Sequence, residues 1–241
     1  MNVTAIHTPV FQAREDLIDF ILHHVSAPAE GTVLAVASKL FALWRGEIAP
    51  YQSVAQKEGL IRRESEWALQ TPLAWLTVKD GMVMTNAGID ESNADGKLLL
   101  LPENLYQLAH EVCMSLRAAW QIKQLGLVVT DSMILPFRAG VIAGAVAYAG
   151  FRGVRDLRGK ADIFGKKLEV TLVNAADSLA SAAALEMGEA GEQKPLCVIE
   201  NAPVEFVDRV PQNEIKYPIE NDLFTPLFLA AGYKKKGEKN D

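Results

Sequence analysis

The sequence has few cysteines and no long apolar run, and each absence excludes a class of protein. Its 241 residues include only two cysteines, Cys113 and Cys197, which stand in apolar surroundings outside any CxxC pair. Such cysteines are typical of buried, reduced thiols in a cytoplasmic protein rather than of a disulfide framework or a zinc site. The most apolar span, residues 139–154, is too short and too rich in glycine for a membrane helix, which needs about 20 apolar residues. The first residues also lack the basic region and apolar core of a secretory signal peptide.

Two common nucleotide motifs are missing as well, because neither a GxxxxGK[ST] phosphate loop nor a GxGxxG turn occurs in the chain. The net charge of −6 argues against a nucleic-acid partner, since non-specific binding needs a basic surface. An anionic substrate therefore requires a local basic pocket or a metal ion. What the chain does have, 49% hydrophobic residues and the length for a substantial core, predicts one large globular domain or two interlocked ones.

A run of asparagine, glycine and acidic residues, NAGIDESN, covers residues 86–93 and follows a predicted β-hairpin. Residues 73–78 and 82–85 are β-prone, and the Asp-Gly pair between them favours a tight turn. Gly88 permits a backbone geometry that other residues resist, so Asp90 is expected just past a strand end, with Asn93 able to face the same ligand. The segment is either half of a metal site or an Asx-rich surface turn.

A second carboxylate ends an apolar stretch of buried-strand type, in which residues 125–129 lead into Thr-Asp-Ser at 130–132. Mg²⁺ and Mn²⁺ take oxygen ligands, and sites of phosphate transfer often supply only one or two carboxylates, leaving the other positions to phosphate and water. Asp90, Asp131 and Ser132 fit that ligand set. The hypothesis requires the two strand ends to meet.

Apolar periodicity predicts most of the remaining elements. Helices are expected over residues 15–24, 56–70, 103–124 and 177–187, and strands over residues 2–11, 32–37, 167–173 and 196–200. Ser38 and Lys39 follow the strand over 32–37, where they either hold a phosphate or begin the next turn. From Arg138 the sequence is small and apolar, which predicts a helix around Gly144 at a domain or subunit contact. Residues 233–241 are predicted to form a disordered basic tail.

A charged stretch, residues 155–165, includes two glycines, and its density of charge indicates substrate handling. Arg138, Arg155 and Lys160 are candidates for binding the carboxylates of the substrates. The predicted catalytic residues are Arg138, Asp162 and Glu169.

Five segments follow one another along the chain: NAGIDESN, the strand ending in Thr-Asp-Ser, RAGVIAGAVAYAGF, RGKADIFGKKLEVT and NAADSLASAAALEMGE. Together, over about residues 6–203, they resemble the γ-glutamyl ligases that add glutamate to the coenzyme F-420 precursor, and a sub-group identified as folate γ-glutamate ligases is more similar still. The resemblance implies an α/β fold of mixed α+β type, with two domains, mixed sheets and an intertwined homodimer. It also implies GTP as cosubstrate, with ATP as an alternative, Mg²⁺ or Mn²⁺, and room for a monovalent cation.

Carried over residue by residue, the resemblance implies metal ligands at Asp90, Asp131, Ser132 and Glu189. It implies nucleotide contacts in an N-terminal segment, after the second strand, in the acidic turn and in a late loop: Thr8, Pro9, Val10, Phe11, Ser38, Lys39, Asn93, Met187, Gly188, Glu189, Ala190, Gly191, Glu192, Gln193 and Lys194.

Two positions depart from the family. Leu43 stands where a lysine is expected near the phosphates, and Met133, Ile134 and Leu135 replace a segment that usually carries Gly-Arg. The lost lysine and arginine would have offset phosphate charge. The implied function is a cytoplasmic ligase that joins L-glutamate to the carboxylate of the F-420 precursor or of a folate, and the alternative is a silent relative that only binds a nucleotide or pterin-like ligand.

Overall fold

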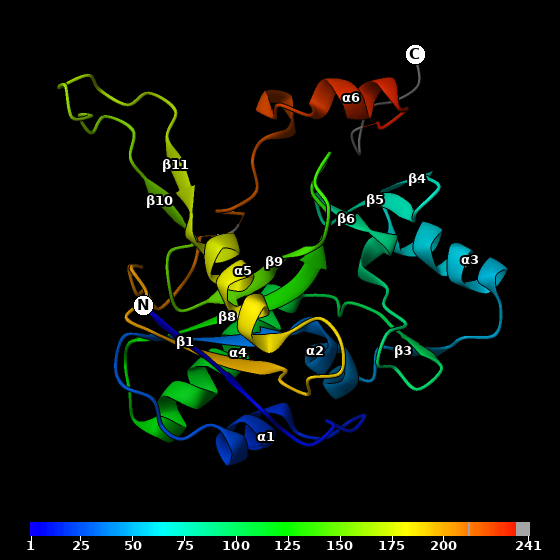
Figure 1. The fold of residues 1–241 in the computed structure, drawn as a ribbon, viewed down its shortest axis with the longest axis horizontal. Coiled ribbons are helices and arrows are strands. Elements are labelled where there is room, and N and C mark those ends of the chain that lie inside the picture. Colours follow the sequence, from blue (N-terminus) through cyan, green and yellow to red (C-terminus); the bar gives the residue numbers. More distant parts are fainter. Residues whose placement is uncertain (212, 235–241) are drawn as a thin grey trace. The chain divides into compact units, whose positions relative to one another are not determined.

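The computed structural model describes residues 1–211 and 213–234, and these fall into two compact units (Figure 1). Of the described residues, unit 1 combines Met1–Gly46 with those from Pro102 to Ile215, and unit 2 combines Glu47–Leu101 with those from Lys216 to Lys234. The chain therefore leaves unit 1 after its second helix, forms most of unit 2, and returns. Both units contain helices and strands, which confirms the predicted mixed α and β class.

A five-stranded mixed sheet forms the centre of unit 1, in the order β1, β12, β2, β8, β9. The strands are β1 (Asn2–Ile6), β2 (Thr32–Ala37), β8 (Leu125–Met133), β9 (Ile142–Ala149) and β12 (Leu196–Glu200). Only the β2–β8 pair is parallel, and the other three pairs are antiparallel. The predicted strands at 32–37 and 196–200 are confirmed, whereas the first strand ends at Ile6 and not at Phe11.

Four helices belong to the same unit. They are α1 (Leu17–His24), α2 (Ser38–Arg45), α4 (Leu105–Trp120) and α5 (Ala175–Met187). Helix α5 packs on the sheet face that carries Val33, Val128 and Cys197, and its buried residues recur at helical spacing. Helix α4 packs along β8 and β9 and also contacts α1.

Unit 1 also carries a short hairpin of β10 (Val154–Asp156) and β11 (Leu172–Asn174), with a long loop between them (Figure 1). The strand predicted over 167–173 is wrong for most of its length, because within it only Leu172 and Val173 pair with β10. Asp162 organises part of the loop, since one oxygen of its carboxylate accepts the N–H groups of Phe164 at 2.8 Å and Lys166 at 2.9 Å.

Two small sheets and a helix form the main part of unit 2. The elements are β3 (Ile48–Pro50) with β7 (Lys97–Leu99), β4 (Trp67–Gln70) with β5 (Trp75–Lys79) and β6 (Met82–Thr85), and α3 (Val54–Glu64). The predicted hairpin is confirmed, and Asp80 and Gly81 in its turn both have positive φ, at 51° and 70°. The helix predicted to run to Gln70 ends at Glu64, because the residues from Trp67 pair with β5 instead.

The C-terminal part of unit 2 contains η2 (Ile219–Asn221) and α6 (Thr225–Ala230). Tyr233, where the predicted tail begins, is buried, and its ring lies edge-on to Trp67 at a centroid distance of 6.2 Å. Most of the tail, residues 235–241, lies outside the described residues.

The helix predicted around Gly144 is wrong, because this segment forms strand β9. Ile142–Ala149 pairs with β8 along its length, and most of it is buried within the chain. A Cβ atom on Gly144 would overlap the side chain of Met133, which lies across the glycine. The small residues therefore serve close packing inside unit 1, and they are no argument for a helix at a subunit contact.

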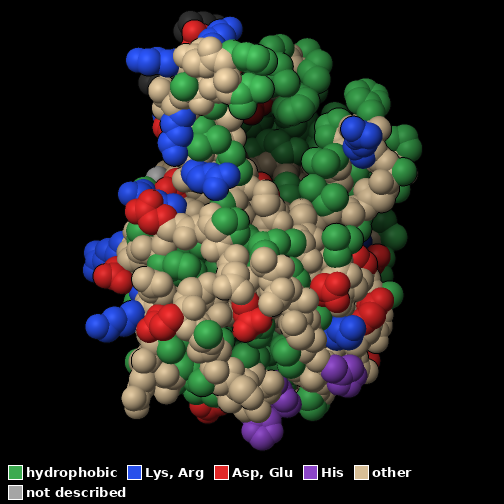
Figure 2. Space-filling view, turned by 60° about the vertical axis from the view of Figure 1, so that its left-hand side comes forward, with side chains coloured by type: hydrophobic (Ala, Val, Ile, Leu, Met, Phe, Trp, Pro, Cys, Tyr) green, Lys and Arg blue, Asp and Glu red, His purple; other side chains and the backbone are tan. Residues whose placement is uncertain are grey.

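Two surface properties bear on partners. No helix within the described part of the chain has the length and apolar character needed to cross a membrane. On the face shown in Figure 2, lysine and arginine side chains are interspersed with carboxylates rather than gathered in one basic patch.

Candidate functional site

The candidate site begins where the pairing between the parallel strands β2 and β8 ends. Ala37, the last residue of β2, pairs with Thr130 of β8, so the carboxyl ends of both strands lie at the same edge of the sheet. Ser38 and Lys39 follow directly on β2, and Asp131 and Ser132 follow Thr130 on β8. In open α/β sheets, ligands usually bind outside the carboxyl ends of the strands.

One hydrogen bond joins the two strand ends. The hydroxyl of Ser38, which is buried, donates to Oδ1 of Asp131 over 3.0 Å. Ser38 begins α2, so the turn from β2 into that helix brings its side chain to the neighbouring strand. Of the two interpretations of Ser38, the turn is observed, and the phosphate contact stays a prediction.

A second hydrogen bond brings in the loop after α5. Ser132 Oγ donates to Oε2 of Glu189 over 2.7 Å. Glu189 follows Gly188, which has φ 82° and ψ 169°, a conformation that is essentially confined to glycine. A Cβ on Gly188 would also overlap the carboxyl group of Glu192. The glycine is therefore what lets the chain leave α5 with Glu189 turned towards Ser132.

The two hydrogen-bonded pairs, Ser38–Asp131 and Ser132–Glu189, lie on opposite faces of the sheet. Asp131 pairs with Gly144, and Ser132 pairs with Ala143, which packs against α5. Because successive side chains of a strand point to opposite faces, Ser132 and Glu189 lie on the α5 side and Asp131 on the other. The carboxyl end of β8 thus carries two separate pairs, each made of one carboxylate and one hydroxyl.

Three of the four segments expected to contact a nucleotide meet in unit 1, and the fourth, the turn with Asn93, belongs to unit 2. The N–H of Thr8 donates to the carbonyl oxygen of Gln193 over 2.9 Å, and the N–H of Ala37 donates to that of Pro195 over the same distance. Glu192 closes the late loop on itself, because its carboxylate accepts the N–H of Ala190 at 2.8 Å. The N-terminal segment, the end of β2 and the late loop are therefore joined through the backbone.

Three predicted nucleotide residues of the N-terminal segment and of α5 are buried. Thr8 is fully buried, Phe11 is buried with its ring 4.9 Å from that of Phe20, and Met187 is part of the core beneath α5. Pro9 and Val10, between Thr8 and Phe11, are exposed.

Asp90 and Asn93 belong to unit 2. Asp90 exchanges backbone hydrogen bonds with Leu99, and its Oδ1 accepts the N–H of Ser92 at 2.7 Å. The turn before it contains three successive residues with positive φ, Asn86, Ala87 and Gly88. The sequence does not predict the positive φ of Ala87, because alanine rarely adopts this conformation. Because Asp131 lies in unit 1, the metal shared between Asp90 and Asp131 stays a prediction.

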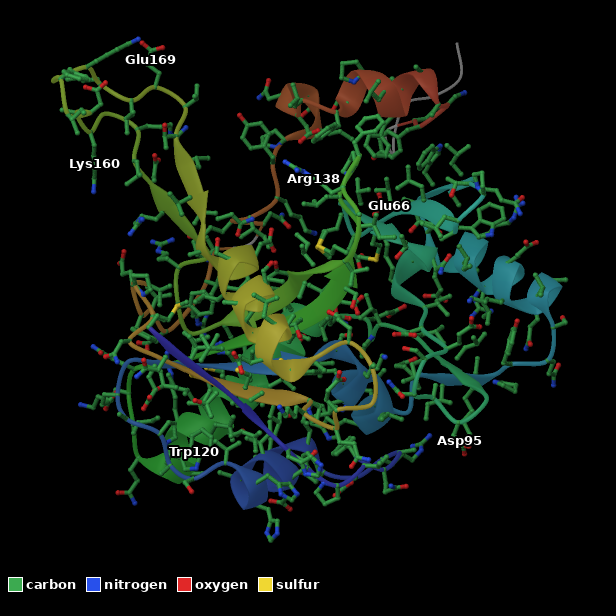
Figure 3. The ribbon with its side chains drawn as sticks, viewed as in Figure 1. Glu66, Asp95, Trp120, Arg138, Lys160 and Glu169 are labelled. Atoms are coloured by element: carbon green, nitrogen blue, oxygen red, sulfur yellow. The ribbon has the colours of Figure 1, made fainter. Side chains whose placement is uncertain are left out.

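The predicted catalytic residues do not gather at this edge. Arg138 lies in the exposed turn after β8, and its N–H donates to the carbonyl of Leu135 over 3.3 Å. Asp162 and Glu169 belong to the hairpin loop between β10 and β11, and Figure 3 shows Lys160 and Glu169 at its outer end. Their catalytic roles stay predictions.

The donor atoms of the edge are all oxygens. Asp131 and Glu189 supply carboxylates and Ser38 and Ser132 supply hydroxyls, which suits hard cations such as Mg²⁺ and Mn²⁺ better than Zn²⁺. Among the described residues, no three or more His, Cys, Asp and Glu side chains lie together in a group that could hold a metal ion. Oxygens from a phosphate or from water would have to complete either coordination shell.

The two cysteines take no part in this site. Both are free and buried, and burial raises the pKa of Cys113 and that of Cys197 to about 11. Each thiol is therefore protonated near neutral pH, which disfavours it as a nucleophile.

Comparison with known proteins identifies the family. The family model described as F420-0:Gamma-glutamyl ligase matches residues 5–201. The chain belongs to this family. A coenzyme F420:L-glutamate ligase of Methanococcus maripaludis is 38% identical over 146 residues, which is 61% of this chain and 58% of that protein. The ligase of Methanopyrus kandleri is 34% identical over 76% of this chain and 80% of its own length. That of Archaeoglobus fulgidus is 29% identical over 79% and 83%.

All predicted site residues lie within the part of the chain that matches the F420-0:gamma-glutamyl ligase family. The alignment with the Methanococcus maripaludis ligase covers somewhat more than half of that relative, 58% of its length.

The two places expected to depart from the family pattern, Leu43 and residues 133–135, fall in unit 1. Leu43 is half-buried in α2, and its carbonyl accepts the N–H of Arg14 at 2.9 Å. Ile134 and Leu135 are exposed in the turn after β8.

Proposed function

We propose that this chain is a metal- and nucleotide-dependent γ-glutamyl ligase, which forms an amide between L-glutamate and an acceptor carboxylate. The observation that carries the proposal is the pair of contacts Ser38–Asp131 and Ser132–Glu189 at the carboxyl edge of two parallel strands. Family membership supports the reaction type, and the names of the relatives support the coenzyme F-420 precursor as acceptor. A folate is the second acceptor that we propose to test.

The reaction needs activation of the acceptor, because a carboxylate is a poor electrophile. Transfer of the terminal phosphoryl group of GTP, or of ATP, to a carboxylate oxygen gives an acyl phosphate and a nucleoside diphosphate. The amine of glutamate then attacks the acyl carbon, the C–N bond forms, and inorganic phosphate leaves as the amine loses a proton. Catalysis of the first step consists mainly of positioning and of electrostatic stabilisation.

The oxygen donors fit Mg²⁺ or Mn²⁺. Asp131 would hold one ion, and Glu189 with Ser132 would hold a second. Asp90, the other predicted ligand, belongs to unit 2. Such ions, when bound, neutralise phosphate charge and align the transferred group. The residues themselves contribute orientation, because Ser38 fixes one oxygen of Asp131 and Ser132 fixes one oxygen of Glu189.

The joined loops give a rationale for nucleotide binding. Thr8 ties the N-terminal segment to the late loop, and Lys39 adds a positive charge at the start of α2. We therefore assign the nucleotide to the region around the end of β2, Pro9, Val10 and the late loop.

A homodimer is part of the proposal, and the β10–β11 hairpin is the observation that favours it. Ile163, Phe164 and Val170 in its loop are 85% to 90% exposed, which is unusual for large apolar side chains in a monomer. Light scattering on the purified protein would test the assembly, and a monomer would refute it.

The ligase itself is tested by incubating the protein with glutamate, Mn²⁺, GTP or ATP, and each acceptor in turn, followed by mass spectrometry. A product heavier by one glutamyl residue supports the ligase and identifies acceptor and nucleotide. Nucleotide binding without any product would instead favour the silent relative, to which the changes at Leu43 and Leu135 point.

A further inference from the structure

We propose that Asp177 and Ser181, two side chains of α5, are positioning residues that hold Asp131 and Ser132 in place through strand β9. Neither residue touches the candidate ligands. The inference rests on the proposed function only in treating Asp131 and Ser132 as metal ligands.

Strand β8 loses one of its two neighbours just before the ligands. The pairing of β2 with β8 ends at Ala37 and Thr130, whereas the pairing with β9 continues to Met133. Among the described strands, the backbone of Asp131 and Ser132 therefore pairs only with β9. The backbone positions of Asp131 and Ser132 therefore depend on those of their partners in β9, Gly144 and Ala143.

Strand β9 is itself the edge of the sheet, so its outer backbone groups need other partners. Oδ1 of Asp177 accepts the N–H of Ala145 at 2.8 Å, and Ser181 Oγ donates to the carbonyl of Ala143 over 2.6 Å. Asp177 and Ser181 are one helical turn apart, so they lie on the same face of α5. Two short side chains thus clamp the part of β9 that pairs with Thr130 and Ser132.

Small residues on both elements make these contacts possible. The facing parts of the core are alanines from α5 and from β9, which allow the helix axis to approach the strand: Ala176, Ala180, Ala183, Ala143 and Ala145. At such a separation, serine and aspartate are long enough to reach the backbone. This explains the small-residue character of both segments without a subunit contact.

The carboxylate of Asp177 has little freedom to rotate. Its Oδ2 accepts from Nδ2 of Asn174 at 2.6 Å, while Oδ1 of Asn174 accepts the N–H of Asp177 at 3.0 Å. Asn174 is the N-cap of α5, so the cap of the helix and the clamp on β9 form one unit. At its other end, α5 leads through Gly188 to Glu189, which binds Ser132 directly.

The test compares Ser181→Ala with Ser178→Ala. Ser178 is an exposed hydroxyl of the same helix that donates to the carbonyl of Asn174 over 2.6 Å and makes no bond to β9. Two quantities are measured on the full chain: binding of Mn²⁺ alone by calorimetry, and amide hydrogen exchange of peptides from β8 and β9. Ser181→Thr, which keeps the hydroxyl, serves as the rescue variant, and Asp177→Asn as a second disruption.

Ser181→Ala should weaken Mn²⁺ binding by about tenfold or more, the usual effect of losing a residue that orients a metal ligand. Exchange should rise in residues 130–133 and 142–145 while residues 125–129 keep the wild-type rate. Asp177→Asn should act in the same direction, Ser181→Thr should restore both quantities, and Ser178→Ala should match the wild type.

Two results would overturn the proposal: a uniform rise of exchange over 125–149, which marks a merely structural contact, or Ser181→Ala and Asp177→Asn both behaving like Ser178→Ala. If the wild-type chain binds no Mn²⁺, the metal part of the proposed function fails, and the exchange pattern still decides the positioning role.

Discussion

Adding a single methyl group at Gly188 should change either the stability of the fold or the geometry of the candidate site. Its φ of 82° and ψ of 169° lie in a region that only glycine adopts without strain. Gly188→Ala should cost about 1 to 3 kcal/mol of folding free energy if the backbone keeps this conformation. For a chain of this size, such a cost lowers Tm by about 2 to 12 °C.

The loop can instead relax, and the structure shows what it would lose. The new methyl group would overlap the carboxyl group of Glu192, which now accepts the N–H of Ala190. Moving Glu192 releases the turn that places Glu189 against Ser132, so relief of strain should appear as weaker Mn²⁺ binding. Either outcome differs from the wild type, in Tm or in metal affinity.

Gly191→Ala is the matched control in the same loop. Gly191 has no positive φ, and a Cβ there would have no atom within 4 Å. Thermal unfolding followed by circular dichroism and Mn²⁺ calorimetry should therefore leave Gly191→Ala close to the wild type. If Gly188→Ala matches Gly191→Ala in both measurements, the reasoning about the late loop is refuted.

Four further predictions follow from the same structure. Asp131→Asn keeps the volume but removes the charge, so most metal-dependent activity should be lost with Tm little changed, and unaltered Mn²⁺ affinity in calorimetry would contradict this. Arg117→Met should destabilise the fold by at least about 2 kcal/mol in urea unfolding, because its guanidinium donates to the carbonyls of Leu125, Gly150 and Val207, whereas Asp208→Ala should cost under about 1 kcal/mol. Both thiols should resist a thiol reagent at pH 8 until the protein unfolds, since burial raises the pKa of each to about 11, and rapid labelling of the folded protein would contradict their burial. GTP binding, followed by calorimetry, should disappear in excess chelator, and undiminished binding would favour the silent relative.

The elements with a clear local signal could be predicted from the sequence. The strands at 32–37 and 196–200 are short apolar runs between turn residues, and the hairpin has an Asp-Gly turn. The segment around Gly144 has no such signal, because alanine and glycine at nearly every position fit a close-packed strand as well as a helix. The segment forms a strand because it pairs with β8, a contact that local composition does not show.

The candidate site could be predicted only as separate pieces. Asp131 and Ser132 follow recognisably from an apolar strand that ends in polar residues. Their partners do not, because Ser38 is 93 residues away from Asp131 and Glu189 is 57 residues away from Ser132. The contacts of α5 with β9 have no sequence signal either. An aspartate at the start of a helix is typical of a cap, whereas Asn174 is the cap here and the carboxylate of Asp177 accepts the N–H of Ala145.

The charge at the β8 edge links these contacts to function. Ser38 and Ser132 orient the carboxylates of Asp131 and Glu189, but a neutral hydroxyl leaves their negative charge in place. A phosphate oxygen held about 4 Å from one such carboxylate meets a repulsion of about 4 kcal/mol at an effective dielectric constant near 20. Leucine at 43 and at 135 adds no positive charge that could offset this repulsion. The same pairs that repel a bare triphosphate would attract a divalent cation, so the proposed ligase is expected to bind its nucleotide as the metal complex.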